Sequence, residues 1–266
     1  MQVDPEIIER MEELGYAILP GELSAPQIAA LKDELEAAIN ADLPALAEME
    51  QQTGKQHPDR WMVHNAMLRG RELARMIEHE TMQAYFSHFL GEHCILYSFQ
   101  TSSMPPGSSN YSNRIHVDCP RLIPGYHTNM GALFPLDDLT EENGATYVLP
   151  GSHKSMTQPS EEQFNSQSIR LTCPAGSLIF LDPRTWHRGG VNRTAKGRHM
   201  LTIGGCRSYM RSRFDYPRLI AHMKSDILDI VGPVGRRFLG YNVRMPATME
   251  EYYLPADQRL YLANQG

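Results

Sequence analysis

The segment from Arg114 to Pro120 (R-I-H-V-D-C-P) places an imidazole and a carboxylate two residues apart, at His116 and Asp118. Successive side chains of a β-strand alternate between its two faces, so in a strand this pair would leave the same face. With one more histidine it would form the 2-His-1-carboxylate arrangement, which leaves adjacent positions on Fe(II) open for a cosubstrate and dioxygen. The His-x-Asp pattern also occurs by chance, so the prediction depends on finding the missing ligand.

The candidate for that ligand is His187. It follows the apolar run 177–181, which begins after a glycine turn and ends at Asp182-Pro183. The imidazole is therefore expected just past the end of a strand, beside the flexible pair Gly189-Gly190. Ligands that converge on one ion are commonly placed on the rims of rigid strands in this way.

Arg198 stands eleven residues after His187, on the next strand candidate. An arginine buried inside a barrel requires an anion, because an unpaired buried charge is costly. A guanidinium group matches a carboxylate with two parallel hydrogen bonds. A dicarboxylic cosubstrate would supply such an anion.

The elements expected to position these residues are short strands in the central half of the chain, separated by Gly, Pro and Asn turns. Seven such strands predict an antiparallel jelly roll. Helices are expected over 4–14, from Ser24 to about Glu50, over about 70–90 and over 219–230, with a brief strand near 16–20. We expect a single domain: a helical part at about 1–93, a jelly-roll core at about 94–207, and a helical or irregular part at about 208–266. The strand candidates are 94–101, 113–119, 127–136, 145–149, 168–172, 177–181 and 198–207.

Four motifs in this order give the sequence a specific resemblance. They are the H-x-D at His116 and Asp118, E-N-G-A-x-x-V-L-P-G-S-H-K over 142–154, W-H-x-G-G-x-N-R over 186–193, and Arg198. The opening E-E-L-G-Y-A-I-L-P over 12–20 fits the same pattern. Over about 5–207 the chain resembles the phytanoyl-CoA dioxygenase family of Fe(II)/2-oxoglutarate oxygenases.

This resemblance implies that His116, Asp118 and His187 bind Fe(II) and that Arg198 binds the distal carboxylate of 2-oxoglutarate. It implies a double-stranded β-helix with the iron at its mouth, in agreement with the strand pattern. It also implies that 2-oxoglutarate and O2 react to give succinate, CO2 and an oxidised substrate. Halogenating members lack the metal carboxylate, so Asp118 favours hydroxylation or a related oxidation.

Weaker candidates have structural alternatives. Gln100 lies on the strand before the H-x-D segment, and Thr202 shares a strand face with Arg198; either could contact the cosubstrate, or simply line the barrel. His127 and Asn129 would share one face of the 127–136 strand, where they could touch the substrate. A hydrogen-bonded interior histidine explains His127 equally well.

The stretch from 184 to 218 is strongly basic, with one acid, Asp215. A basic block near the site suggests a small-molecule substrate that carries an anionic group, and we expect Arg211 and Arg213 to contribute to its binding. The alternative is a solvated face that balances the acidic N-terminal helices. The basic residues are Arg184, Arg188, Arg193, Lys196, Arg198, Arg207, Arg211, Arg213 and Arg218.

Composition excludes several classes of function. The 266 residues carry a formal net charge of -6, which offers no basic footprint for nucleic acid or an anionic membrane. No signal peptide or apolar stretch of membrane-spanning length is recognisable, so we expect a cytoplasmic protein. The four scattered cysteines lack metal or disulfide spacing and are expected to be free thiols. The sequence does not determine an oligomeric state.

The sequence therefore predicts an Fe(II)/2-oxoglutarate-dependent dioxygenase that hydroxylates or otherwise oxidises a small molecule. Two alternatives stay open: a cupin-type metalloenzyme that does not use 2-oxoglutarate, and a non-catalytic jelly roll that only binds a ligand. The substrate and the position of attack do not follow from the sequence.

Overall fold

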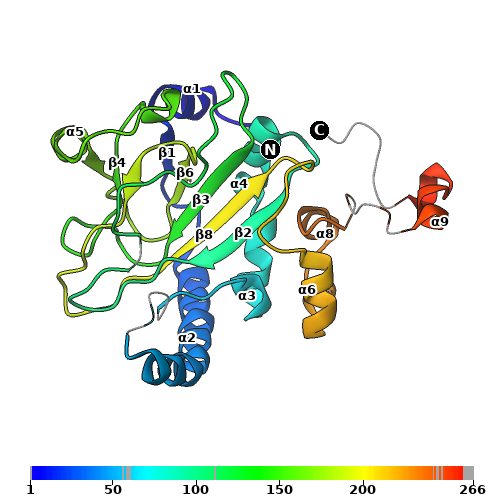
Figure 1. Ribbon diagram of the computed structural model, residues 1–266, viewed down its shortest axis with the longest axis horizontal. Coiled ribbons are helices and arrows are strands. Elements are labelled where there is room, and N and C mark those ends of the chain that lie inside the picture. Colours follow the sequence, from blue (N-terminus) through cyan, green and yellow to red (C-terminus); the bar gives the residue numbers. More distant parts are fainter. Residues whose placement is uncertain are drawn as a thin grey trace.

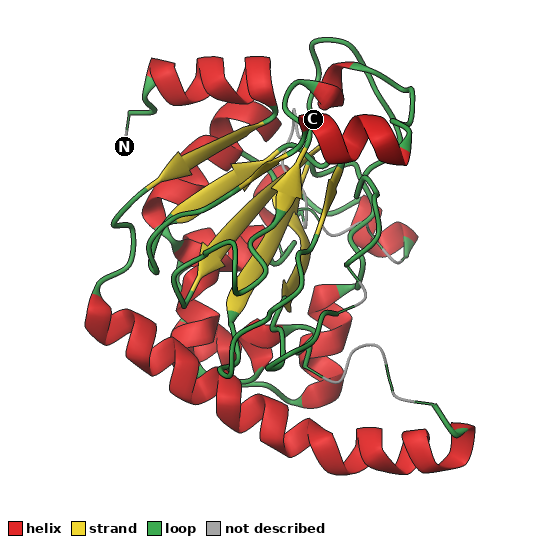
Figure 2. Ribbon diagram, turned by 90° about the vertical axis from the view of Figure 1, so that its left-hand side faces the viewer, coloured by secondary structure: helices red, strands yellow, loops and turns green. Residues whose placement is uncertain are grey.

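The computed structural model describes residues 2–55, 57, 61–110, 112–241, 243, 246 and 248–259. Its centre is a pair of antiparallel sheets with helices around them, which confirms the predicted jelly roll (Figures 1 and 2). The strands are β1 (Tyr16–Leu19), β2 (Ile95–Thr101), β3 (Asn129–Pro135), β4 (Tyr147–Val148), β5 (Ile169–Arg170), β6 (Leu178–Leu181), β7 (His187–Arg188) and β8 (Met200–Cys206).

The larger sheet has the strand order β1-β6-β3-β8-β2, and the smaller one has the order β5-β4-β7. Because side chains alternate along each strand, the larger sheet buries one face against the helices and the other inside the jelly roll. Ala132, Phe180 and Ile203 belong to the core beneath the helices. Leu133 and Ile179, one position away, belong to the core between the sheets. The larger sheet thus contributes side chains to two separate apolar cores, one on each face.

The helices begin where capping residues predict. Asp4 accepts a hydrogen bond from the Glu6 N–H (2.9 Å) at the start of α1, and Ser24 with Gln27 forms a capping box at the start of α2. The described α-helices are α1 (Pro5–Leu14), α2 (Ala25–Thr53), α3 (Arg71–Arg75), α4 (Glu80–Leu90), α5 (Glu161–Gln167), α6 (Tyr216–Met223), α7 (Ile227–Ile230), α8 (Pro233–Phe238) and α9 (Met249–Tyr252); short 3-10 turns cover Ala66–Leu68, Met76–Glu78, Ser152–Lys154 and Ala256–Gln258.

Several predicted elements are corrected. The segment 113–119 is not a strand, because His116 makes only a single β-bridge, to His187. The N–H groups of Asp118 and Cys119 both donate to the Pro183 carbonyl, so the regular hydrogen-bond pattern of a strand pair does not continue past His116. The helix expected over 70–90 is broken by a 3-10 turn before His79 caps α4. The helix expected over 219–230 is two helices, α6 and α7, because Lys224 adopts a left-handed conformation at the end of α6.

Other boundaries shift by a few residues. Helix α2 runs to Thr53, slightly beyond its predicted end, and the remainder of the polar stretch 51–60 lies largely outside the described residues. Strand β7 was not predicted, because two residues are too few to show alternation. All four cysteines are free, as predicted. No helix in the described part of the chain is long and apolar enough to cross a membrane.

Candidate active site

Three side chains that the sequence singled out come together at the edge of the smaller sheet. His187 lies on β7, and its backbone N–H and C=O both pair with those of His116. Asp118 follows two residues later. One ligand atom from each of the three lies within 4.8 Å of the others, and among the described residues no other His, Cys, Asp and Glu group meets this criterion. The three side chains therefore converge through one β-bridge and a turn, and not through the continuous strand predicted over 113–119.

Hydrogen bonds fix the tautomers of both imidazoles. Nδ1 of His116 is 2.7 Å from the Arg114 carbonyl, and Nδ1 of His187 is 2.9 Å from the Thr185 carbonyl. A carbonyl only accepts, so each Nδ1 carries the proton and each Nε2 presents a lone pair. The Nε2 atoms lie 3.7 and 3.8 Å from the two oxygens of Asp118.

The electrostatics also favour a metal ion. Burial, and then the neighbouring His187, lower the pKa of His116, which keeps that imidazole in the neutral form that binds metals. Donor atoms about 2.1 Å from one ion and at right angles are about 3 Å apart. The two Nε2–carboxylate distances, 3.7 and 3.8 Å, are longer than this, and the Asp118 side chain is 56% exposed, which leaves it space to adjust toward both imidazoles. The donor set fits a 2-His-1-carboxylate site for Fe(II).

Arg198 is buried, with 1% of its surface exposed. Its guanidinium donates to the carbonyls of Ser102 (2.9 Å) and Gly144 (3.4 Å), and its Nε has no partner. Burial lowers the pKa of Arg198 to about 10, which still leaves it protonated at neutral pH. The negative charge of Asp137 raises the pKa of Arg198 in part, but the Asp137 carboxylate already forms an ion pair with Lys32 at 2.6 Å. A buried cation with an unused donor fits the carboxylate of a dicarboxylic cosubstrate.

The weaker cosubstrate candidates lie on adjacent strands. Gln100 on β2 is the cross-strand partner of Thr202 on β8, and Thr202 also pairs with Leu133, which belongs to the interior core. Both side chains are half-buried. The structure thus places Gln100 and Thr202 beside each other on the sheet that leads to Arg198.

The substrate-binding candidates separate into two groups. His127 and Asn129 line a cavity, and Nδ1 of His127 is 3.1 Å from an Asp182 oxygen. Arg211 and Arg213 are exposed and line neither this cavity nor the metal site; Arg213 donates to the Gln100 side chain at 2.7 Å. In the sequence, Asp182 only marks the end of the apolar run 177–181, and its contact with His127 could not be predicted because the partners are 55 positions apart.

The segment that carries His187 packs directly on Gly15. This glycine ends α1 in the left-handed conformation (φ 79°), and its carbonyl accepts a hydrogen bond from the Thr185 hydroxyl at 3.0 Å. A Cβ atom here would overlap the Thr185 Oγ1 and lie 2.6 Å from Nδ1 of His153. The Thr185 carbonyl in turn orients His187, so the α1 terminus supports the candidate site.

Gly15→Ala is expected to lower the free energy of unfolding by about 2 to 4 kcal/mol, because strain at positive φ adds to a steric clash. Gly21→Ala is the matched control, since Gly21 has nearly the same φ (77°) but no atom within 4 Å of the position that an alanine Cβ would take. It should cost only about 1 kcal/mol. Urea denaturation of both variants measures the difference, and equal losses would show that the contact with Thr185 does not matter.

Comparison with known proteins identifies the family. A family model for phytanoyl-CoA dioxygenase matches residues 11–200. The chain belongs to the phytanoyl-CoA dioxygenase family. Its dependence on Fe(II), 2-oxoglutarate and O2 follows from this membership and from related proteins named as iron/2-oxoglutarate-dependent dioxygenases.

Individual relatives support this assignment. The chain is 27% identical over 267 residues to the uncharacterized protein Rv1501 of Mycobacterium tuberculosis, covering 98% of this chain and 95% of that one. It is 22% identical over 269 residues to the iron/alpha-ketoglutarate-dependent dioxygenase ausO of Aspergillus calidoustus, covering 93% and 90%. Among solved structures, EctD from S. alaskensis, crystallised with 2-oxoglutarate and 5-hydroxyectoine, has a TM-score of 0.64 at 18% identity, covering 77% of this chain and 76% of EctD. That similarity concerns the fold.

Proposed function

We propose that the protein hydroxylates or otherwise oxidises a small molecule, using Fe(II) held by His116, Asp118 and His187. The observation that carries this proposal is the convergence of three donor atoms within 4.8 Å, with both imidazoles held in the tautomer that binds metals through Nε2. Arg198 is proposed to bind the distal carboxylate of 2-oxoglutarate. Iron and 2-oxoglutarate, when bound, supply the activation of dioxygen, and 2-oxoglutarate is converted to succinate and CO2.

The chain's own residues provide binding, orientation and exclusion of water. The carbonyls of Arg114 and Thr185 hold the imidazoles in place, so the donor set is pre-organised. The guanidinium of Arg198 binds one end of 2-oxoglutarate, and the apolar core that includes Leu133 contributes to excluding water from the interior. A carboxylate at position 118 occupies the place that a halide ligand would need, which favours hydroxylation over halogenation.

The proposal is tested by adding Fe(II) and then 2-oxoglutarate to the protein without oxygen. A weak visible charge-transfer band is expected, followed on aeration by succinate release that a correct substrate accelerates. A panel of candidate small molecules then identifies the substrate class. Tight iron binding without the band would support a metalloenzyme that does not use 2-oxoglutarate. If the wild-type protein releases no succinate and binds iron no better than His116→Ala, the jelly roll acts only as a ligand-binding protein.

A further inference from the structure

A cavity of about 260 Å³ lies beside the proposed metal site. Its walls come from the loop 119–129, from His153 and Lys154, and from 182–184. None of the three proposed metal ligands lines it. The cavity is nevertheless tied to the site, because the N–H groups of Asp118 and Cys119 both donate to the carbonyl of Pro183, at 2.8 and 3.0 Å. A ligand in the cavity therefore lies against the backbone that carries Asp118.

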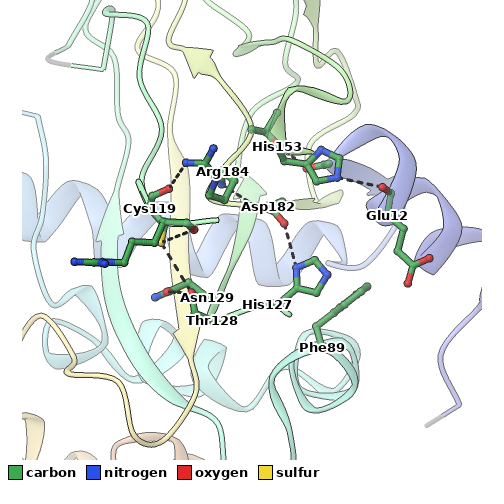
Figure 3. Close-up of polar contacts among 12 residues, drawn as sticks. Glu12, Phe89, Cys119, His127, Thr128, Asn129, His153, Asp182 and Arg184 are labelled. Carbon is green, nitrogen blue, oxygen red and sulfur yellow. Dashed lines mark hydrogen bonds and ion pairs between the residues drawn. The ribbon is translucent and has the colours of Figure 1, made fainter. Parts of the chain in front are cut away.

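A buried arginine, Arg184, lines the cavity. Only 7% of the Arg184 surface is exposed. Its guanidinium donates to the carbonyls of Cys119 (3.2 Å) and Ser155 (2.5 Å), and its Nε is buried without a partner. Among the described residues, no carboxylate forms an ion pair with this side chain. Figure 3 shows Arg184 next to Cys119, beside Asp182. A buried cation that lacks a counter-ion and borders an open cavity is suited to bind an anion.

Most of the remaining charges that line the cavity are also positive. Arg121 and Lys154 are exposed and add two positive charges to the lining. Among the described lining residues Asp182 is the single carboxylate, and both of its oxygens are used: one accepts from the Arg184 N–H (2.7 Å), the other faces Nδ1 of His127 (3.1 Å). His127 also packs edge-on against Phe89 (Figure 3). Three cations thus face one carboxylate that is already hydrogen-bonded.

The loop side of the cavity is apolar. Leu122, Ile123, Pro124 and Tyr126 line it, and Ile123 is 47% exposed. The Arg207 guanidinium lies 3.8 Å from the Tyr126 ring centre, and its Nε donates to the His127 carbonyl at 2.7 Å, so the end of the loop is held in place. Apolar side chains next to positively charged ones fit a molecule with an anionic group on a hydrocarbon body.

We propose that this cavity binds the anionic end of the substrate, a carboxylate or phosphate group on an apolar carbon body, with Arg184 as its main ligand and Arg121 and Lys154 at the rim. The inference rests on the proposed function, because it makes the cavity an extension of the oxidation site. It also replaces Arg211 and Arg213, which lie outside the cavity, as the residues that would recognise an anionic substrate.

The test is equilibrium binding of three matched probes, octanoate, octyl phosphate and 1-octanol, measured by calorimetry in low salt with saturating 2-oxoglutarate. Both anions share the apolar chain of the alcohol, so any difference reports on the anionic group. We expect at least one anion to bind about ten-fold or more tightly than octanol. Comparison of the two anions distinguishes a carboxylate substrate from a phosphate substrate.

Two sets of variants locate the binding. Arg184→Gln should weaken the preferred anion at least about ten-fold and leave octanol binding unchanged, because only the charge is lost. The double variant Arg121→Gln/Lys154→Gln, at exposed positions, should weaken the anion about three- to ten-fold and tests the proposal even where Arg184→Gln fails to fold. Arg10→Gln, an exposed cation on α1, is the matched control and should change nothing.

Three results would overturn the proposal: octanol binding as tightly as both anions, anion binding that the rim variant leaves unchanged, or anion binding that occurs without 2-oxoglutarate and is lost at its saturating concentration. The last would place the probe at Arg198. The measurement needs no turnover, so an absent charge-transfer band refutes the proposed function without affecting the anion result. Conversely, an intact band with no anion preference refutes only the anion site.

Discussion

Replacing Asp118 with alanine is expected to lower the rate of succinate release from 2-oxoglutarate at least about 100-fold. The variant keeps two imidazoles but loses the one anionic donor of the proposed site, and both iron affinity and catalysis depend on the complete set. The side chain is 56% exposed, and the backbone bond from its N–H to the Pro183 carbonyl is retained. The free energy of unfolding should therefore change by less than about 0.5 kcal/mol.

The measurement combines succinate release, iron binding at equilibrium and urea denaturation. Asp33→Ala is the matched control, because Asp33 is an exposed carboxylate on α2, remote in sequence from the site. It should behave as the wild-type protein in all three assays. Asp118→Glu, which keeps the charge on a longer side chain, should retain more iron than Asp118→Ala. Succinate release at the full rate in Asp118→Ala would contradict the metal-site assignment.

The proposed metal ligands could be predicted from sequence because each stands in a strong local pattern. His116 and Asp118 are two residues apart, and His187 follows the apolar strand β6 beside a glycine pair. The route by which they converge could be predicted only in part. A strand over 113–119 would place His116 and Asp118 on one face, whereas the structure uses one bridge to His187 and a turn at Pro183.

Buried charge was harder to predict, because burial depends on segments that are distant in sequence. Arg198 was marked by its place on a strand candidate eleven residues after His187, but Arg184 falls in the same basic block as Arg211 and Arg213, and nothing in its local sequence separates it from them. The structure buries Arg184 and Arg198 and leaves the other two arginines exposed. The two buried side chains donate hydrogen bonds to backbone carbonyls that are distant in sequence. Arg184 donates to Ser155, 29 positions away, and Arg198 donates to Ser102, 96 positions away.

The short strands were also difficult to predict from the sequence. Strand β7 is two residues long; it pairs with β4, which is equally short, and its His187 also bridges to His116. Two residues carry no periodicity, so the sequence gives no sign of the smaller sheet's full extent. Long strands such as β3 and β8, with seven residues each, were recognisable from composition and turns. What the sequence predicts well is therefore the larger sheet and the local motifs that carry the proposed ligands.

Replacing Arg198 with glutamine is expected to raise the KM for 2-oxoglutarate at least about 30-fold, with a smaller effect on turnover at saturating cosubstrate. The guanidinium is buried, and its Nε has no partner in the protein. Its charge is costly without an anion, which is why burial lowers the pKa of Arg198 to about 10. Glutamine keeps hydrogen-bonding capacity toward Ser102 and Gly144 but removes the charge that a carboxylate would neutralise.

A bound anion should relieve the cost of the buried charge on Arg198 and so stabilise the fold. Stabilisation by 2-oxoglutarate is therefore a second measurement, which distinguishes ligand binding by Arg198 from a purely structural role. 2-Oxoglutarate at 100 times its wild-type Kd should stabilise the wild-type protein by about 2.7 kcal/mol, and a loss of affinity of at least about 30-fold in Arg198→Gln should reduce this gain to about 0.9 kcal/mol or less. Arg198→Lys, which retains the charge without the planar fork, should lie between the two. Arg193→Gln, at an exposed arginine nearby in sequence, should keep the full gain. A folded Arg198→Gln variant with unchanged KM and unchanged stabilisation would show that 2-oxoglutarate is bound elsewhere.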